Sequence, residues 1–342
     1  MQRAKAPARA ATIRLGVVGY GVIGRHHARN VGAMRGVELT GVVDSSPTAR
    51  AEAERAGHRA FSSIGALLRA GIDGAIVAVP TSAHETVAAQ LIRAARPILV
   101  EKPLAPTLAA AKRIIALAQA ARVPLMVGYV ERYNPAVEAL RSFLESGKLG
   151  GLISISARRV GAFPPRVRDA NVLVDIGVHD IDLVAYLTGA YLTLTSAQGG
   201  MAVQHDQLDF ANLLLDAEGC LVSIEANWIT PIKLREMSLT GTNGFCRVDY
   251  ITQEASFVRG RSFSPTTGFE EQVAQYKAGL LTSLPVRKRE PLARQLEVFV
   301  AGVRGAQLPD PHVALASLRI AEEATAEITR QQIARGTAAR PA

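Results

Sequence analysis

The sequence has few aromatic residues and no long block of one charge. Phe, Trp and Tyr make up 5% of its 342 residues. Proteins that bind single-stranded nucleic acid usually stack bases on aromatic side chains, so this composition argues against nucleic acid as a partner. The 39 Lys and Arg exceed the 30 Asp and Glu, giving a formal net charge of +9, but they are scattered along the chain. Phosphate-bearing ligands or plain composition bias explain this excess better.

Cysteine is also scarce. Cys220 and Cys246 stand alone, without a CxxC pair or a nearby His. We expect both to be small core residues in a reducing compartment, forming neither a disulfide nor a metal site. No apolar run approaches the ~20 residues that a membrane span needs. The basic N-terminal stretch lacks the apolar segment of a signal peptide, so a cytoplasmic protein with no membrane partner is expected.

The chain is long enough for two domains at ~150 residues each. Up to residue 127, short and nearly all-apolar strand-like runs alternate with helical runs. Apolar strands alternating with helices predict a parallel, doubly wound sheet with both faces covered, in a domain over 1–127. The expected strands are 13–19, 37–44, 74–80, 97–103 and 123–129.

After residue 128 the pattern changes. A helix near 134–147 precedes runs that alternate apolar and polar residues, mostly between 192 and 257. This alternation predicts a mostly antiparallel sheet in a second α/β domain over 128–334. We expect 258–289 to be irregular, two helices near 290–304 and 311–334, and a frayed tail over 335–342.

A GxGxxG motif ends the first expected strand and opens a helix. Glycines there permit a tight turn and let the backbone approach a pyrophosphate, which the helix N-terminus stabilises. The alternative is a glycine turn in an unrelated α/β domain. The predicted cofactor residues in the turn are Gly19, Tyr20, Gly21, Val22, Ile23 and Gly24.

Asp44 ends the second strand, where a carboxylate would accept hydrogen bonds from an adenosine ribose. Because that carboxylate would repel a 2′-phosphate, NAD is favoured over NADP as the cofactor. The alternative role for Asp44 is a helix N-cap.

Two further strand ends carry polar residues. Glu101 and Lys102 lie at the C-terminal end of the strand 97–103, where open α/β sheets bind ligands. Pro80, Thr81 and His84 follow the preceding strand. We assign all five to the cofactor side, although Lys102 could be a solvated lysine and His84 could simply begin a helix.

The stretch Leu173 to Val184 is apolar except for one His and three Asp. At ~100° per residue, Asp175, His179 and Asp182 fall on one helix face, while Asp180 lies off it and is assigned a structural role. In the catalytic interpretation, His179 is a general base oriented by Asp175, as oxidation of a secondary alcohol requires. A satisfied core network and a metal site are the alternatives; we predict no metal.

The glycine turn, "EKP", "GYVERYNP" and "DIGVHD", in this order and spacing, resemble the Gfo/Idh/MocA oxidoreductases. The resemblance runs from Ile13 to about Arg330. It implies an N-terminal Rossmann domain and a second domain with a large open sheet, which often packs against a partner subunit. It also implies that Lys102 and His179 sit beside the nicotinamide and the reacting carbon.

A narrower resemblance is to UDP-N-acetylglucosamine 3-dehydrogenases, through "VGYVERYNPAV", "RRVGAFPPRVRD" and "VDIGVHDID". It implies oxidation of the sugar 3-hydroxyl to a ketone, which a separate pyridoxal-phosphate aminotransferase then aminates. Four arginines could bind the diphosphate or simply be solvated: Arg158, Arg159, Arg166 and Arg168. The other predicted substrate-binding residues are Lys102, Tyr129, Arg132, Asn134, Asp175 and His179.

Three functions remain open. The first is a UDP-sugar 3-dehydrogenase that is a homo-oligomer, either dimer or tetramer. The second is a dehydrogenase of another sugar or polyol, such as inositol. The third is a regulator that senses NAD or sugar without catalysis. Tyr129 and Tyr133 stand where the narrower group would have His and Phe, which leaves the choice of sugar open, and Glu131 with Arg132 could merely form an interdomain ion pair.

Overall fold

The computed structural model describes residues 11–163, 170–204, 206–260 and 281–334. The chain divides into two compact units, which are described separately. Unit 1 comprises Met1–Gly128 and Leu292–Pro311, and unit 2 comprises Tyr129–Pro291 and His312–Ala342. The expected tail over 335–342, Arg166 and Arg168 lie outside the described residues.

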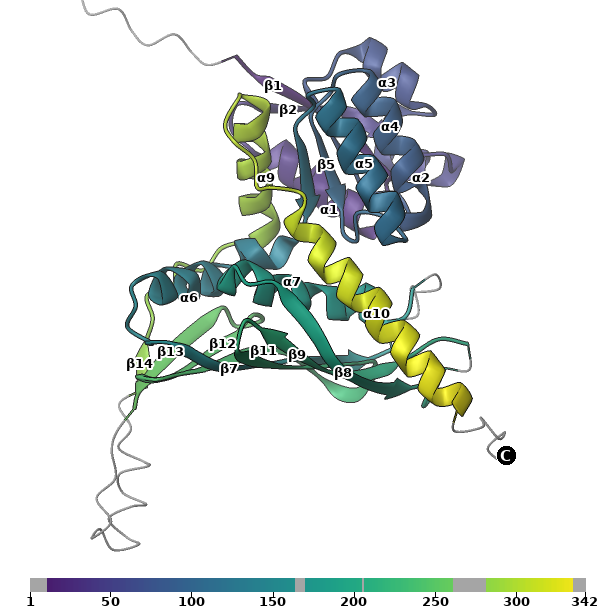
Figure 1. Cartoon of the computed structure of the whole chain (residues 1–342). Coiled ribbons are helices and arrows are strands. Elements are labelled where there is room, and N and C mark those ends of the chain that lie inside the picture. The colour runs from purple at the N-terminus through teal and green to yellow at the C-terminus, as the bar shows by residue number, and fades with distance from the viewer. Residues whose placement is uncertain (1–10, 164–169, 205, 261–280, 335–342) are drawn as a thin grey trace, which may run out of the picture. The chain divides into compact units, whose positions relative to one another are not determined.

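Unit 1 is built on a six-stranded sheet in the order β3-β2-β1-β4-β5-β6, with every pairing parallel. This confirms the predicted doubly wound sheet. Figure 1 shows α9 on one side of this sheet and α4 and α5 on the other. The strands are β1 Ile13–Val18, β2 Val37–Val43, β3 Ala60–Phe61, β4 Gly74–Val77, β5 Ile98–Glu101 and β6 Leu125–Gly128. The helices are α1 Val22–Ala33, α2 Pro47–Arg55, α3 Ile64–Ala70, α4 His84–Arg93, α5 Leu108–Ala120 and α9 Pro291–Val303.

Local sequence explains where these helices begin. Ser46, Ser63 and Thr107 each accept a hydrogen bond from a backbone amide of the first turn of α2, α3 and α5. Such side chains satisfy amides that have no partner within the helix. The central strands β4 and β5 are buried throughout, as expected when helices cover both faces of a parallel sheet.

The unit boundary differs from the expected one at the C-terminal side. Residues 292–311, which include most of α9, belong to unit 1 and not to the domain expected over 128–334. The Arg304 guanidinium donates to the Gly36 carbonyl (3.3 Å), and Val303 lies against Gly74 at the start of β4. These contacts attach the helix to the Rossmann sheet.

Unit 2 contains an eight-stranded sheet in the order β14-β13-β12-β11-β7-β10-β9-β8. All pairings are antiparallel except β7 with β10, which confirms the mostly antiparallel prediction. The strands are β7 Leu152–Ala162, β8 Leu192–Gly200, β9 Phe210–Ala217, β10 Cys220–Asn227, β11 Ile229–Gly241, β12 Gly244–Asp249, β13 Glu254–Arg259 and β14 Leu281–Ser283. β14 lies within the segment expected to be irregular.

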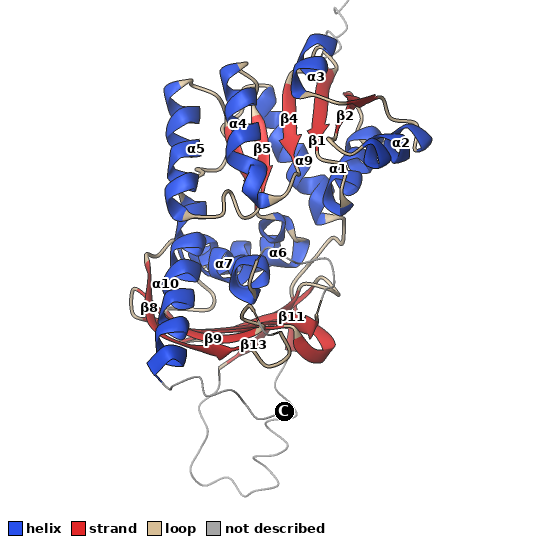
Figure 2. Cartoon of the chain, turned by 90° about the vertical axis from the view of Figure 1, so that its right-hand side faces the viewer, coloured by secondary structure: helices blue, strands red, loops and turns tan. Residues whose placement is uncertain are grey.

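Helices α6 Pro135–Glu145, α7 Val178–Thr188 and α10 Val313–Ala334 lie on one face of this sheet (Figures 1 and 2). The opposite face is not covered by any element within the described ranges. Side chains alternate accordingly: in β9 every second residue from Ala211 to Ala217 is buried, and those between are exposed. A period-two pattern of this kind is typical of a sheet with one packed face.

The described residues contain no helix that is both long and apolar enough to cross a membrane. Cys220 and Cys246 are both buried and free.

Candidate functional site

The three glycines of the turn between β1 and α1 have different surroundings. A Cβ on Gly19, whose φ is +97°, would lie 2.4 Å from the Ala78 carbonyl oxygen. A Cβ on Gly24 would lie 2.0 Å from the Gly19 carbonyl oxygen, whereas a Cβ on Gly21 would meet nothing within 4 Å. Gly19 and Gly24 therefore close the turn against β4 and α1, and Gly21 leaves an open surface. This arrangement fits a dinucleotide pyrophosphate.

The N-terminus of α1 is available to such a group. Its N-cap is Gly21, and no side chain caps its first turn. Val22 and Ile23 are exposed at 55% and 37%, whereas Tyr20 is buried. Uncapped amides and the helix dipole favour an anion at this position. Tyr20 contributes its backbone here, since its side chain is in the core.

Asp44 is fixed beside the turn by two backbone amides. Its Oδ2 accepts from Tyr20 N and its Oδ1 from Ser46 N, both at 2.8 Å. The N-cap of α2 is Ser46 and not Asp44, so the alternative N-cap role does not apply. A carboxylate has about four lone-pair sites, which leaves acceptor capacity for ribose hydroxyls.

At the end of β5, Glu101 is buried and bonded on both oxygens. Its Oε1 lies 2.6 Å from His27 Nε2, and its Oε2 accepts from the backbone amide of Lys102 at 3.3 Å. Lys102 follows the strand, half-buried, and the Lys102–Pro103 peptide is cis. Glu101 therefore links α1 to the backbone that carries Lys102.

Sequence reasoning missed His27. The available signal was its position three residues after Gly24, on the helix face that also buries Ala28 and Val31. A histidine on such a face needs a polar partner.

His84 also has a packing role in unit 1. Its ring nitrogens lie 3.0 Å from the carbonyl oxygens of Pro103 and Val79, so it joins the ends of β4 and β5. Burial lowers the pKa of His84 below its usual value. Pro80 is exposed and Thr81 half-buried at the same strand end, where both are open to a ligand.

In unit 2, the residues before α7 form a π-helical turn, Leu173–Gly177, in which the Val178 amide donates to the Leu173 carbonyl. Such turns are frequent at functional sites. Asp175 lies on this turn and His179 on the first turn of α7; both are half-buried. The His179 ring meets the Tyr129 ring edge to face, with centroids 6.4 Å apart.

The other two aspartates of this stretch are buried and paired with arginines. Asp182 accepts from both Nε (2.7 Å) and Nη2 of Arg132. Asp180 accepts from Arg159 Nε at 2.6 Å and Nη2 at 3.1 Å. Asp180 is thus structural, as the helical projection indicates. Asp182 differs from Asp175 and His179, since it holds α7 to the segment before α6.

Three predicted substrate-binding residues are engaged inside unit 2. The Tyr129 hydroxyl lies 2.6 Å from Ser317 Oγ, and burial raises its pKa above the ordinary value. Asn134 caps α6 and donates to the Tyr250 carbonyl (2.9 Å). Arg132 is buried against Asp182. These contacts give the three side chains a structural role.

The two described arginines of "RRVG" lie on opposite faces of the sheet, as consecutive strand residues must. Arg159 is buried and also bonds Glu131 at 2.9 Å. Arg158 lies on the uncovered face and pairs with Glu225 at 2.7 Å. The alternative expectation was an ion pair between Glu131 and Arg132. Instead, Glu131 pairs with Arg159, and Arg132 pairs with Asp182.

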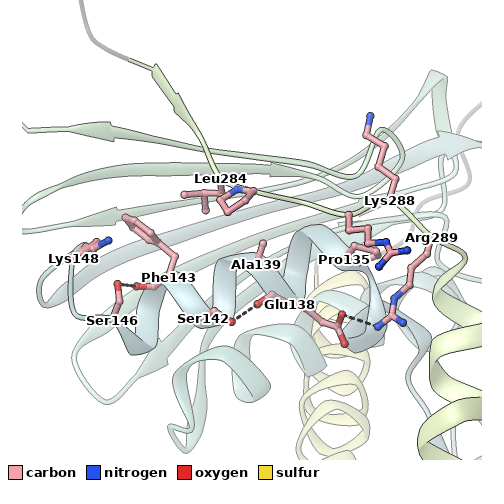
Figure 3. Close-up of a pocket in the computed structure, with 12 residues that line it drawn as sticks. Pro135, Glu138, Ala139, Ser142, Phe143, Ser146, Lys148, Leu284, Lys288 and Arg289 are labelled. Carbon is pink, nitrogen blue, oxygen red and sulfur yellow. Dashed lines mark hydrogen bonds and ion pairs between the residues drawn. The ribbon is translucent and has the colours of Figure 1, made fainter.

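A cavity of about 950 Å³ lies in unit 2 between α6 and the segment 284–289. Figure 3 shows Arg289 reaching Glu138 at its edge, an ion pair of 3.3 Å. None of the predicted site residues lines this cavity. Within the described ranges, no group of three or more His, Cys, Asp and Glu side chains converges to hold a metal ion.

The turn, the uncapped helix and Asp44 together define a dinucleotide-binding Rossmann domain, and a half-buried His one turn after Asp175 in the second unit fits a general base. Family models agree. Residues 13–129 match the model of an oxidoreductase family with an NAD-binding Rossmann fold, and residues 137–247 match the C-terminal domain of the same family. The chain belongs to the Gfo/Idh/MocA family, and its cofactor is NAD.

Individual relatives act on sugars and polyols. The chain is 30% identical over 295 residues to UDP-N-acetylglucosamine 3-dehydrogenase from Acidithiobacillus ferrooxidans, covering 85% of this chain and 88% of that protein. It is 33% identical over 225 residues to inositol 2-dehydrogenase 2 from Saccharopolyspora erythraea, covering 63% and 66%. The solved structure of the Acidithiobacillus enzyme, GnnA, has a TM-score of 0.80 at 27% identity, covering 93% and 98%. The chain is thus an oxidoreductase of a family that acts on CH–OH groups of sugars and polyols.

Proposed function

We propose that the chain oxidises the 3-hydroxyl of UDP-N-acetylglucosamine, or of a close UDP-sugar, to a 3-keto sugar with NAD. The observation that carries the proposal is His179, half-buried one turn after Asp175, in a chain whose other unit carries the glycine turn expected for NAD. The similarity to the Acidithiobacillus enzyme over most of both chains favours the UDP-sugar.

In the proposed mechanism His179 takes the proton of the sugar hydroxyl, and Asp175 orients the ring and raises its basicity. Lys102 of unit 1 hydrogen-bonds the same oxygen as negative charge develops on it. NAD, when bound, supplies the hydride acceptor. Glu101 and His27 hold the backbone that carries Lys102.

A ketone at this position can be aminated, so the proposed partner in the reaction sequence is a pyridoxal-phosphate aminotransferase. The uncovered sheet face of unit 2, with Leu214, Leu221 and Phe245 each at least 40% exposed, supports the proposed homo-oligomer.

The first test compares wild type with His179→Ala, supplied with NAD and UDP-N-acetylglucosamine. Loss of a general base should lower the rate of NADH formation by ~10²-fold or more, while the dissociation constant for NAD stays unchanged. His312→Ala, an exposed histidine of the same unit, is the matched control. If His179→Ala retains wild-type turnover, the assignment of the base is wrong.

The second candidate is a polyol dehydrogenase of the inositol type, which the similarity to inositol 2-dehydrogenase 2 favours. A panel of UDP-N-acetylglucosamine, free N-acetylglucosamine and myo-inositol separates the two, since only the UDP-sugar enzyme requires the nucleotide. Binding of NAD without turnover of any alcohol would instead favour the non-catalytic regulator.

A further inference from the structure

Arg235 of β11 lies directly opposite Arg159 of β7 in the sheet of unit 2. Side chains of directly paired residues project from the same face, and like charges in this position destabilise a sheet. That face is the one packed against α7, because Arg159 bonds Asp180 of α7. Two guanidinium groups therefore share the partly buried side of the sheet.

The two arginines differ in their partners. Arg159 is neutralised by Asp180 and Glu131. Arg235 is half-buried, and within the described residues its hydrogen bonds are two long ones, from Nη1 to the backbone carbonyl oxygens of Val160 (3.4 Å) and Leu234 (3.5 Å). Among the residues that the structure describes, it forms no ion pair. The other N–H groups of its guanidinium remain able to donate hydrogen bonds.

The electrostatics agree with this geometry. Burial, and after it the charge of Arg159, lowers the pKa of Arg235 to about 10, although the carboxylates of Asp180, Glu131 and Asp175 act in the opposite direction. A partly desolvated cation without an ion-pair partner is costly unless something offsets it. An anion delivered by a ligand would supply that partner.

Two observations relate Arg235 to the candidate site. Arg159, the residue directly opposite Arg235, bonds Asp180, which directly follows His179 in α7. The register of β11 against β7 also shifts between Ile229 and Leu234, immediately before Arg235. Irregularities of this kind re-aim side chains and are frequent beside active sites.

We propose that Arg235 is a substrate-recognition residue that binds an anionic group of the substrate, a phosphate or a carboxylate, beside Asp175 and His179. The inference rests on the proposed function and deepens it. The fork of Arg235 would bind either group bidentately, as guanidinium groups do. A neutral polyol such as myo-inositol would leave Arg235 without a partner and would bind weakly.

The test measures dissociation constants by calorimetry on protein saturated with NADH, which cannot accept a hydride, so the sugar binds without reacting. The ligands are UDP, UDP-N-acetylglucosamine and the same sugar nucleotide oxidised to a carboxylate at C6. The variants are wild type, Arg235→Gln and the control Arg247→Gln, which removes an exposed arginine of the same sheet that pairs with Glu236. Melting temperatures without ligand, and the dissociation constant for NAD, are measured in parallel.

Arg235→Gln should weaken binding about 10- to 100-fold, and Arg247→Gln should not. Equal loss for all three ligands identifies the diphosphate as the group bound, whereas loss confined to the acidic sugar identifies its carboxylate. The melting temperature of Arg235→Gln should be unchanged or higher, because the variant removes a like-charge pair. A purely structural arginine would lower it.

Wild-type affinity in Arg235→Gln would overturn the inference while leaving the proposed function intact. A lowered melting temperature together with weakened NAD binding would also overturn it, since Arg235 would then be structural. If wild-type protein binds none of the three ligands, the proposed function fails, and this inference fails with it.

Discussion

At the scale of single residues, ion pairs with arginine explain why two aspartates of α7 can be buried. Asp180 and Asp182 are almost completely buried, and each is bound by two nitrogens of one arginine. Burial alone would lower the pKa of Arg132, but the charge and hydrogen bonds of Asp182 raise it above its usual value. The contact of both guanidinium nitrogens with the Asp182 carboxylate holds α7 in position.

Removing one member of this pair should be costly. Asp182→Ala leaves the Arg132 guanidinium buried without its carboxylate, which should lower the free energy of unfolding by about 3–5 kcal/mol. The double variant Arg132→Met with Asp182→Leu should recover most of this loss, since it leaves no isolated charge. Denaturant unfolding followed by circular dichroism measures both.

The control for this prediction is Glu145→Gln, which breaks the exposed Arg141–Glu145 pair of α6. Such pairs contribute about 1 kcal/mol or less. If Asp182→Ala costs no more than Glu145→Gln, Asp182 does not hold the helix.

Helical periodicity correctly placed Asp180 off the helix face that carries His179. It grouped Asp182 with Asp175 and His179, because all three project to one face. The projection assumed a continuous α-helix, whereas Leu173–Gly177 is a π-turn. Moreover, Arg132 is 50 residues away in sequence. Periodicity within one helix carries no information on a partner from another element.

At the scale of elements, the turn from β1 to α1 was predictable in detail because its chemistry is local. Close packing and a positive φ require glycine at particular positions whatever the rest of the chain does. His27 and Glu101 were harder to relate, since the first lies in α1 and the second at the end of β5. Only the parallel order of the strands brings them together.

Two alanine substitutions separate folding from cofactor binding in this turn. Gly21→Ala adds a methyl group to open space, so its melting temperature should match wild type while NAD binding weakens by about tenfold or more. Gly24→Ala places its methyl group against the Gly19 carbonyl, so it should lower both stability and NAD affinity. Calorimetric unfolding and NAD titration measure the two effects.

Unchanged NAD affinity in Gly21→Ala would contradict the placement of the diphosphate on this turn. A Gly24→Ala protein as stable as wild type would contradict the close packing on which the account of the turn depends.

At the scale of the whole molecule, the sequence predicted two sheets of the correct kinds because burial on two faces or one leaves different apolar patterns. It did not predict that 292–311 belongs to unit 1. The buried residues of α9, among them Leu292, Leu296, Phe299 and Val300, show which face packs. They do not show against which sheet, because any apolar surface satisfies the same face.

For the site, too, the sequence shows which residues are candidates but not which of them lie together. Lys102 and His179 were singled out in different parts of the chain, and they lie in different units. The substrate-side arginines were chosen by nearness in sequence to α7, but Arg158 lies on the other face of the sheet and Arg159 is neutralised. Arg235 was not singled out, because strand register decides which side chains face α7.

The most direct test of the proposed function follows the transferred hydride. Wild-type protein is incubated with NAD and UDP-N-acetylglucosamine carrying deuterium at C3, and in a parallel reaction at C4, and the reduced cofactor is analysed by mass spectrometry. We expect deuterium in the reduced nicotinamide from the C3-labelled sugar only. Deuterium from C4, or reduction of NAD by myo-inositol but not by the UDP-sugar, would contradict the account.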